Sequence, residues 1–102
     1  IFPSLYEGSG IPVLEAMACS CAIVASDIPP VRENAGDAAV YFDPENVASI
    51  KRAIVEFQSA PLDSVAERRR RGMERIEPYR PRRVVAKLIN AYESARKDGR
   101  AC

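Results

Sequence analysis

Histidine and tryptophan are absent from this chain of 102 residues, and cysteine occurs only three times. Without histidine, the chain lacks the commonest general base, the Ser–His and Cys–His pairs of nucleophilic catalysis and the usual ligand of transition metals. Cys19, Cys21 and Cys102 are an odd set whose spacing suits neither a disulfide framework nor a zinc or redox site. We therefore expect reduced thiols in a cytoplasmic protein, with Cys19 and Cys21 buried.

Long apolar runs are also missing. No stretch approaches the roughly 20 apolar residues that a membrane-spanning helix needs, and the N-terminal residues do not have the pattern of a secretory signal. The hydrophobic share of 47% and the charged share of 28% are those of an ordinary globular protein, which excludes a disordered or collagen-like chain. The length allows a single domain.

Charge is distributed unevenly along the chain. Residues 1–46 contain seven acidic side chains and one basic one, whereas residues 47–102 contain fourteen basic and seven acidic side chains. Such a division is typical of an acidic functional face beside a basic helical layer. Two solvated surfaces that attract each other would give the same division.

The first half alternates short apolar runs with loop signals. We expect strands at residues 1–4, 21–25 and 38–42, a glycine loop at 5–10, a helix at 11–19 and one helical turn at 31–34. Pro12 suits the first position of the helix, where a missing N–H costs nothing. The run at 21–25 is continuously apolar, as in a strand buried on both faces.

The second half is predicted to be helical. Asn46 is a suitable N-cap, and Pro61 can begin the next helix before Pro78 and Pro81 break it. The last helix, ending near Gly99, has a stripe of apolar residues at helical spacing that we expect to pack in the core. This stripe consists of Val84, Val85, Leu88, Ile89 and Tyr92.

The order strand, helix, strand, turn, strand, helix predicts an α/β fold with a Rossmann-like parallel sheet and flanking helices. Three strands make a small sheet, and the sequence starts inside a strand. We therefore expect an incomplete half of a larger α/β domain. Residues 1–60 would form its α/β core and residues 61–102 its C-terminal helices.

The loop before the first helix is the candidate binding site. The first N–H groups of a helix have no partner within the helix, and glycines let an anion, usually a phosphate, approach them. Glu7 in the loop and Glu15 in the helix add acceptors suited to sugar or ribose hydroxyls. Three plainer interpretations stay open: an ordinary glycine loop, a Glu15 that only complements the helix dipole, and a solvated Glu7.

Several separated segments resemble the C-terminal domain of retaining glycosyltransferases of the B-type fold, in the large family-four group (group 1). The spacing of Glu7, Gly8, Gly10, Pro12 and Glu15, with Ala16-Met17-Ala18 after them, resembles the signature of two glutamates in that group. Phe2-Pro3-Ser4, Ile23-Val24-Ala25-Ser26-Asp27, Glu33, Gly36-Asp37-Ala38 and Phe42-Asp43-Pro44 follow the same pattern in order. Ser9 departs from it, because a large aromatic residue is common there, and so does Ser20-Cys21, where glycine and a small residue are usual.

The resemblance implies a hexosyltransferase that moves a sugar from a nucleotide diphosphate sugar to an acceptor with retention of configuration, without a metal or cofactor. It implies that Glu7 faces the reacting centre of the donor sugar and that Glu15 binds the ribose. Gly8, Ser9 and Gly10 would contact the sugar or diphosphate through backbone N–H groups. Ile11, Val13 and Leu14 would form the helix start beside the phosphates.

The family also places the acceptor site in an N-terminal domain, and an Arg and a Lys for the diphosphate upstream of the first glutamate. We therefore expect this chain alone to be catalytically silent or nearly so. The alternative is a non-catalytic α/β module that acts in assembly or interaction.

The run of arginines from Arg68 to Arg71 is interpreted first as a solvated helix face. Peripheral contact with the inner face of a membrane is the second interpretation. Nucleic acid is not expected as a partner, because no aromatic residues are interleaved with the arginines.

Overall fold

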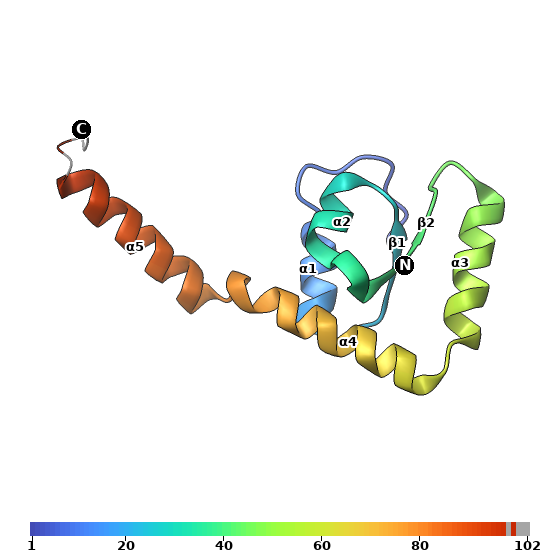
Figure 1. The fold of residues 1–102 in the computed structure, drawn as a ribbon. Helices are drawn as coiled ribbons and strands as arrows, with labels where there is room; N and C mark the ends of the chain where they lie inside the picture. The colour runs from blue at the N-terminus through green and yellow to red at the C-terminus, as the bar shows by residue number, and fades with distance from the viewer. Residues whose placement is uncertain (98, 100–102) are drawn as a thin grey trace.

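The computed structural model describes residues 1–97 and 99, which form an α/β body from which one helix extends (Figure 1). In chain order the elements are α1 (Ile11–Ala18), β1 (Ile23–Ser26), α2 (Pro29–Ala35), the 3-10 turn η1 (Gly36–Ala38), β2 (Ala39–Phe42), α3 (Val47–Ser59), α4 (Leu62–Ile76), the 3-10 turn η2 (Glu77–Tyr79) and α5 (Pro81–Lys97). The α/β class predicted from the sequence is confirmed.

The sheet in the described residues has two parallel strands, with Ile23 opposite Ala39 and Ser26 opposite Phe42. The third predicted strand, at residues 1–4, is reduced to one parallel bridge between Phe2 and Ala25. The Phe2 N–H donates to the Val24 carbonyl at 2.9 Å, and the Phe2 carbonyl accepts from Ser26 at 3.0 Å. The ladder does not extend further, because Pro3 has no N–H and the chain bends at Leu5.

Alternating side chains give the sheet two buried faces. Ile23, Ala25 and Ala39 pack with Val13 and Met17 of α1, and with residues of α2, on one face. Val24, Val40 and Phe42 pack with Ala53 of α3 on the other. The arrangement is three layers, with α1 and α2 on one side of the strands and α3 on the other (Figure 1). All four residues of β1 are buried, as predicted for a strand covered on both faces, but the strand begins two residues later than the predicted run at 21–25 and includes Ser26.

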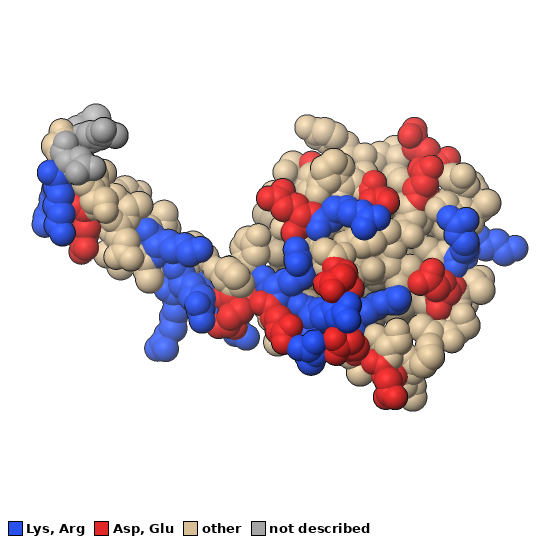
Figure 2. All heavy atoms as spheres, in the orientation of Figure 1, with Lys and Arg blue, Asp and Glu red and all other residues tan. Residues whose placement is uncertain are grey.

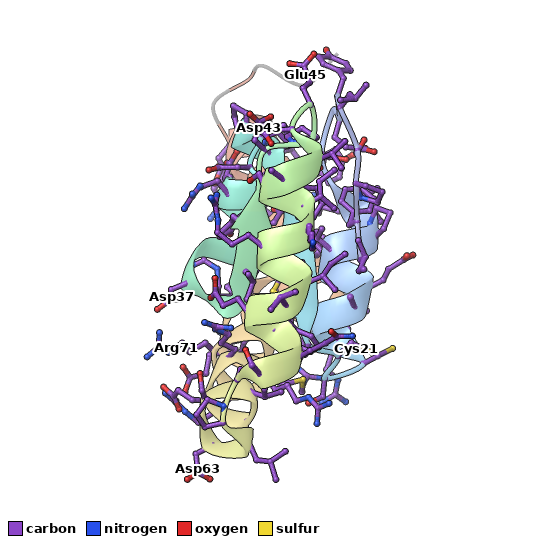
Figure 3. The ribbon with its side chains drawn as sticks, turned by 90° about the vertical axis from the view of Figure 1, so that its right-hand side faces the viewer. Cys21, Asp37, Asp43, Glu45, Asp63 and Arg71 are labelled. Carbon is purple, nitrogen blue, oxygen red and sulfur yellow. The ribbon has the colours of Figure 1, made fainter. Side chains whose placement is uncertain are left out.

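Helix α3 begins where the sequence predicts. The Asn46 side chain accepts a hydrogen bond from the Ser49 N–H at 3.0 Å, which meets one of the free donors of the first turn. Figure 3 shows Asp43 and Glu45 in the loop at this end of α3. The Ser49 hydroxyl in turn accepts from the Asp43 N–H at 3.0 Å, so the cap also ties the helix to the end of β2.

Helix α4 crosses the body and packs against α1. Gly72 permits the contact, since a Cβ at this position would lie 3.1 Å from Cγ of Met17. Helix α5 departs from this body and contacts chiefly η2. None of the helices in the described part of the chain combines the length and apolar character needed to cross a bilayer.

The prediction that the apolar stripe of α5 packs in the core is wrong. Its five side chains are 39–74% exposed, and α5 has no buried residue. The stripe exists as a face of the helix, as the spacing predicted, but the only described element that contacts α5 to any extent is the short turn η2, and this contact leaves the stripe exposed. Pro78 and Pro81 break the helical path after Ile76, so α5 takes a direction of its own away from the sheet (Figure 1).

The prediction of buried thiols is also wrong. Cys19 and Cys21 are free and exposed. They flank Ser20, whose φ of 54° turns the chain after α1, so both side chains lie in a surface turn rather than in the strand. Figure 3 shows Cys21 pointing outward. Cys102 lies outside the described residues.

Candidate functional site

The glycine loop enters α1 through Gly10, the N-cap residue. Its φ of 63° and ψ of 36° are left-handed, and a Cβ would lie 3.2 Å from Nδ2 of Asn34. Only glycine meets both conditions without strain. The Gly10 carbonyl accepts from the Val13 N–H at 3.0 Å, which starts the helix.

The N–H groups of residues 8–11 form no hydrogen bond to any acceptor in residues 1–97 and 99. Gly8 and Ser9 are exposed, and the space beside Gly8 is open, because a Cβ there would meet nothing within 4 Å. Gly10, by contrast, is buried, and a buried donor is costly to leave unmet. These four N–H groups could therefore donate to a ligand.

Glu7 is partly buried in the middle of this loop. The Ser4 hydroxyl lies 2.9 Å from Oε1 of Glu7 and 3.0 Å from the Tyr6 carbonyl oxygen, so it can donate to either. The Glu7 side chain also lines a cavity of about 290 Å³. The other residues around this largely apolar cavity are Leu5, Tyr6, Ile28, Pro29 and Pro30.

Glu15 is exposed on α1 and borders a different cavity, of about 410 Å³. Leu14 and Ala18 of α1 line one side of that cavity, and Ile76, Tyr79, Arg80 and Pro81 line the other. Glu7 and Glu15 thus lie on either side of the helix start without sharing a cavity. Arg80, which lines the same cavity as Glu15, is far from the loop in sequence, so its place there could not be found from the loop motif.

The remaining predicted site residues differ in what they offer. Ile11 is 56% exposed at the helix start, and Leu14 is half-buried. Val13 is 1% exposed, and its N–H is already donated to Gly10, so it contributes packing beneath the loop. Contact of these residues with a donor stays a prediction.

Two residues that the sequence pattern did not indicate, Asn34 and Arg75, support the loop through hydrogen bonds to backbone carbonyls. Nδ2 of Asn34, in α2, donates to the carbonyl of Ser9 at 2.5 Å and lies 3.5 Å from that of Gly10. Arg75, in α4, donates to the carbonyls of Asn34 and Glu33, both at 2.7 Å. No spacing in the sequence connects residues 9, 34 and 75, so only the fold shows the contact.

The arginine run is largely paired with acidic side chains. Arg70 bonds Glu67 and Glu74, while Arg71 bonds Glu67 and Asp37 at 2.9 Å. Hydrogen bonds from Arg70 and Arg71 lower the pKa of Glu67 to about 2. Figure 3 shows Asp37 and Arg71 on the same side of the body, and Figure 2 shows red and blue intermixed over α4.

Within the described residues, no group of three or more His, Cys, Asp or Glu side chains is placed to hold a metal ion. The site as built consists of unpaired backbone donors at a helix start and two carboxylates on either side of it. It lies on the α/β body, in the loop that follows the bridge between Phe2 and β1.

The model of the family "Glycosyl transferases group 1" matches residues 1–75. The chain belongs to this glycosyltransferase family. It is similar to the O-antigen chain mannosyltransferase B of Escherichia coli, with 36% identity over 91% of this chain and 24% of that protein. It is also similar to an MMP alpha-(1->4)-mannosyltransferase of Mycolicibacterium hassiacum, with 34% identity over 98% of this chain and 25% of that protein.

A third relative is an alpha-maltose-1-phosphate synthase of Mycobacterium tuberculosis, with 34% identity over 71% of this chain and 20% of that protein. The chain therefore spans about a quarter of the length of the curated relatives it matches. No solved structure matches the chain. The family predicted from the two-glutamate motif and the segments around it is confirmed.

Proposed function

We propose that this chain forms the donor-binding portion of a retaining glycosyltransferase that uses a nucleotide diphosphate sugar. The observation that supports this most directly is the set of unpaired N–H groups of residues 8–11 at the start of α1. The helix dipole is positive at this end and attracts an anion such as a diphosphate. Family membership supplies the class of reaction.

In this proposal the protein assists the departure of the diphosphate. Cleavage of the sugar–phosphate bond leaves positive charge on the ring and negative charge on the leaving group. The N–H groups of Gly8, Ser9, Gly10 and Ile11 stabilise the developing anion without a metal or cofactor. Glu7 is the catalytic residue, because its carboxylate opposes the positive charge of the ring.

Glu15 is assigned to the ribose hydroxyls. It is exposed on α1, one turn beyond the helix start, and an ionised carboxylate is purely an acceptor. The cavity that it borders is mostly apolar, with Leu14 and Tyr79 in its lining, which suits the flat face of a nucleoside. Retention of configuration and a cytoplasmic location belong to the proposal through the family resemblance.

The first experiment measures donor binding by this chain. Nucleoside diphosphates and their sugars at 100 times the dissociation constant should stabilise the chain by about 2.7 kcal/mol in a thermal unfolding assay. Glu15→Ala should weaken this effect, while Glu45→Ala, an exposed acid in the loop before α3, should not. If no nucleotide or nucleotide sugar shifts the transition at millimolar concentration, the donor-binding proposal is wrong.

The second experiment measures transfer. We expect the chain alone to turn over a nucleotide sugar negligibly, since the proposal assigns the acceptor site to an N-terminal domain. Joined to such a domain, the wild-type sequence should be active, and Glu7→Ala should lose most of that activity. Normal rates with Glu7→Ala would contradict the catalytic assignment.

The second candidate function, a non-catalytic module for assembly or interaction, is favoured by the exposed apolar stripe of α5. Here the partner we propose is an anionic membrane surface. Helix α5 has five basic residues and one acid, and the two sides of a basic amphipathic helix suit lipid headgroups and acyl chains. Figure 2 shows blue side chains gathered along α5.

Sedimentation with vesicles tests this partner. Binding to vesicles of phosphatidylcholine and phosphatidylglycerol should exceed binding to phosphatidylcholine alone and fall as salt rises. Leu88→Asp should abolish it. If the chain binds neither kind of vesicle, the membrane proposal is wrong. If the chain forms dimers that Leu88→Asp dissociates, the stripe is a protein contact and the membrane proposal is also wrong.

A further inference from the structure

Asn34 is the only side chain in the described residues that hydrogen-bonds the backbone of the glycine loop from another element. It is 8% exposed and belongs to α2, whereas the loop precedes α1. Both groups it faces are carbonyl oxygens, so its own contacting atom must be the amide donor, Nδ2. The contact thus has a defined direction: Asn34 donates and the loop accepts.

The direction of those carbonyls fixes the direction of the neighbouring N–H groups. In a trans peptide, the C=O of one residue and the N–H of the next point opposite ways, and no cis peptide occurs in the described residues. The Ser9 carbonyl points at Asn34, so the Gly10 N–H points away from it. The Gly10 carbonyl points toward Asn34 and Val13, so the Ile11 N–H also points out of the helix start.

Asn34 is itself held in place by a residue of α4, Arg75. Arg75 donates to the carbonyls of Glu33 and Asn34, two of the last carbonyls of α2, which have no partner within the helix. Gly36 leaves space for this contact, since a Cβ there would lie 2.7 Å from Cζ of Arg75. A continuous chain of contacts therefore runs from α4 through the end of α2 to the loop.

We propose that Asn34 is a positioning residue, which orients the Gly10 and Ile11 N–H groups toward the diphosphate of the donor. This inference rests on the proposed function and adds a residue far from the loop in sequence. Asn34 would touch neither the sugar nor the phosphate. Its effect on phosphate binding would come entirely from the two peptide units that it holds.

The test titrates this chain with inorganic pyrophosphate and follows the backbone amide resonances of Gly10 and Ile11 by NMR. In the wild type both should shift as pyrophosphate is added. Asn34→Asp keeps the shape but removes the donor, and its carboxylate repels the two carbonyls, so pyrophosphate affinity should fall about tenfold or more. Asn90→Asp, the same change on exposed α5, should behave as the wild type.

A second variant separates positioning from folding. Asn34→Ser retains a short donor, so it should recover part of the affinity that Asn34→Asp loses. The remaining amide spectrum reports whether each variant is folded. If folded Asn34→Asp binds pyrophosphate as the wild type does, or if folded Asn34→Ser recovers none of the lost affinity, the proposal is wrong while the proposed function stands. If the wild type itself shows no shift at Gly10 and Ile11, both are wrong.

Discussion

Helices α4 and α5 have similar sequence patterns, but α4 packs against the body of the structure and α5 does not. Each has five basic residues and apolar residues at helical spacing. Helix α4 packs on α1, buries Gly72 and Ile76, and has acidic partners for most of its arginines. Helix α5 buries no residue and has a single acid of its own. Periodicity therefore predicts that a helix has an apolar face, but not what that face contacts.

The same comparison changes the meaning of the arginine run. Arg70 and Arg71 are drawn into a network with Glu67, Glu74 and Asp37, so much of their charge is neutralised at the surface. On α5, Lys87 forms no ion pair within residues 1–97 and 99. The densest basic segment of the sequence is therefore not where unpaired positive charge accumulates.

The largest expected effect comes from placing an acid on each helix. Ile76→Asp would put a charge at a site on α4 that is 9% exposed, so it should destabilise the chain by at least about 3 kcal/mol. Leu88, on α5, is already 51% exposed, so Leu88→Asp should change the free energy of unfolding by less than about 0.5 kcal/mol. Thermal or urea unfolding of both variants measures the difference. Equal losses would mean that α5 is packed in solution.

A smaller effect is expected at the contact between η1 and α4. Gly36→Ala forces a Cβ onto a residue with φ of 52° and against the Arg75 guanidinium, so we expect a loss of about 2–3 kcal/mol. Gly8→Ala is the matched control, since its Cβ would meet nothing within 4 Å. Unfolding in urea compares them, and a Gly36→Ala variant as stable as Gly8→Ala would contradict the geometry of this contact.

Next in size is the loss of Arg75 itself. Arg75→Met removes two hydrogen bonds from a charged group to the end of α2, which should cost about 2 kcal/mol of unfolding free energy. Arg69→Met is its control on the same helix, because Arg69 is exposed and has no ion pair among the described residues. The two variants should separate clearly in urea unfolding. Should they be equal, Arg75 does not stabilise α2.

The smallest effect concerns pH. Hydrogen bonds from Arg70 and Arg71 lower the pKa of Glu67 to about 2 in the fold, from an ordinary value of 4.5, so they stabilise the fold fully above pH 4.5. That contribution is lost as the pH falls from about 4.5 toward 2. Carboxyl resonances followed by NMR should show Glu67 titrating near pH 2, and Glu67→Gln should remove this part of the acid dependence. A midpoint near 4.5 would show that the network is open in solution.

Local signals predicted most of the elements correctly. The Asn46 cap and the helix that follows Pro61 depend on residues near one another in the chain, and the structure confirms both. The apolar run at 21–25 is confirmed in part, since the buried strand covers Ile23–Ser26. The errors have a common origin. The burial of α5, the burial of Cys19 and Cys21 and the third strand each depended on what lies next to a segment in space.

The candidate site also has features that are local in sequence and features that depend on the fold. Glycine at the start of α1 and the spacing of Glu7 and Glu15 are local. Together with the other short segments that match in order, up to Phe42-Asp43-Pro44, they predicted the family that the comparisons confirm. By contrast, the loop is supported by contacts between distant residues. Asn34 hydrogen-bonds Ser9, which is 25 positions earlier in the chain, and Arg75 hydrogen-bonds Asn34, which is 41 positions earlier. Such contacts leave no periodic or adjacent trace in a single sequence.

The amino-acid sequence alone determined the order of helices and strands, the glycine at the left-handed entrance to α1 and the glycosyltransferase motif, because backbone conformation and capping are decided within a few residues. Tertiary structure decided which charges are neutralised, which apolar face stays uncovered and which way the loop peptides point. Those properties depend on neighbours brought together by folding, and burial and hydrogen bonding are set by these neighbours rather than by residue type.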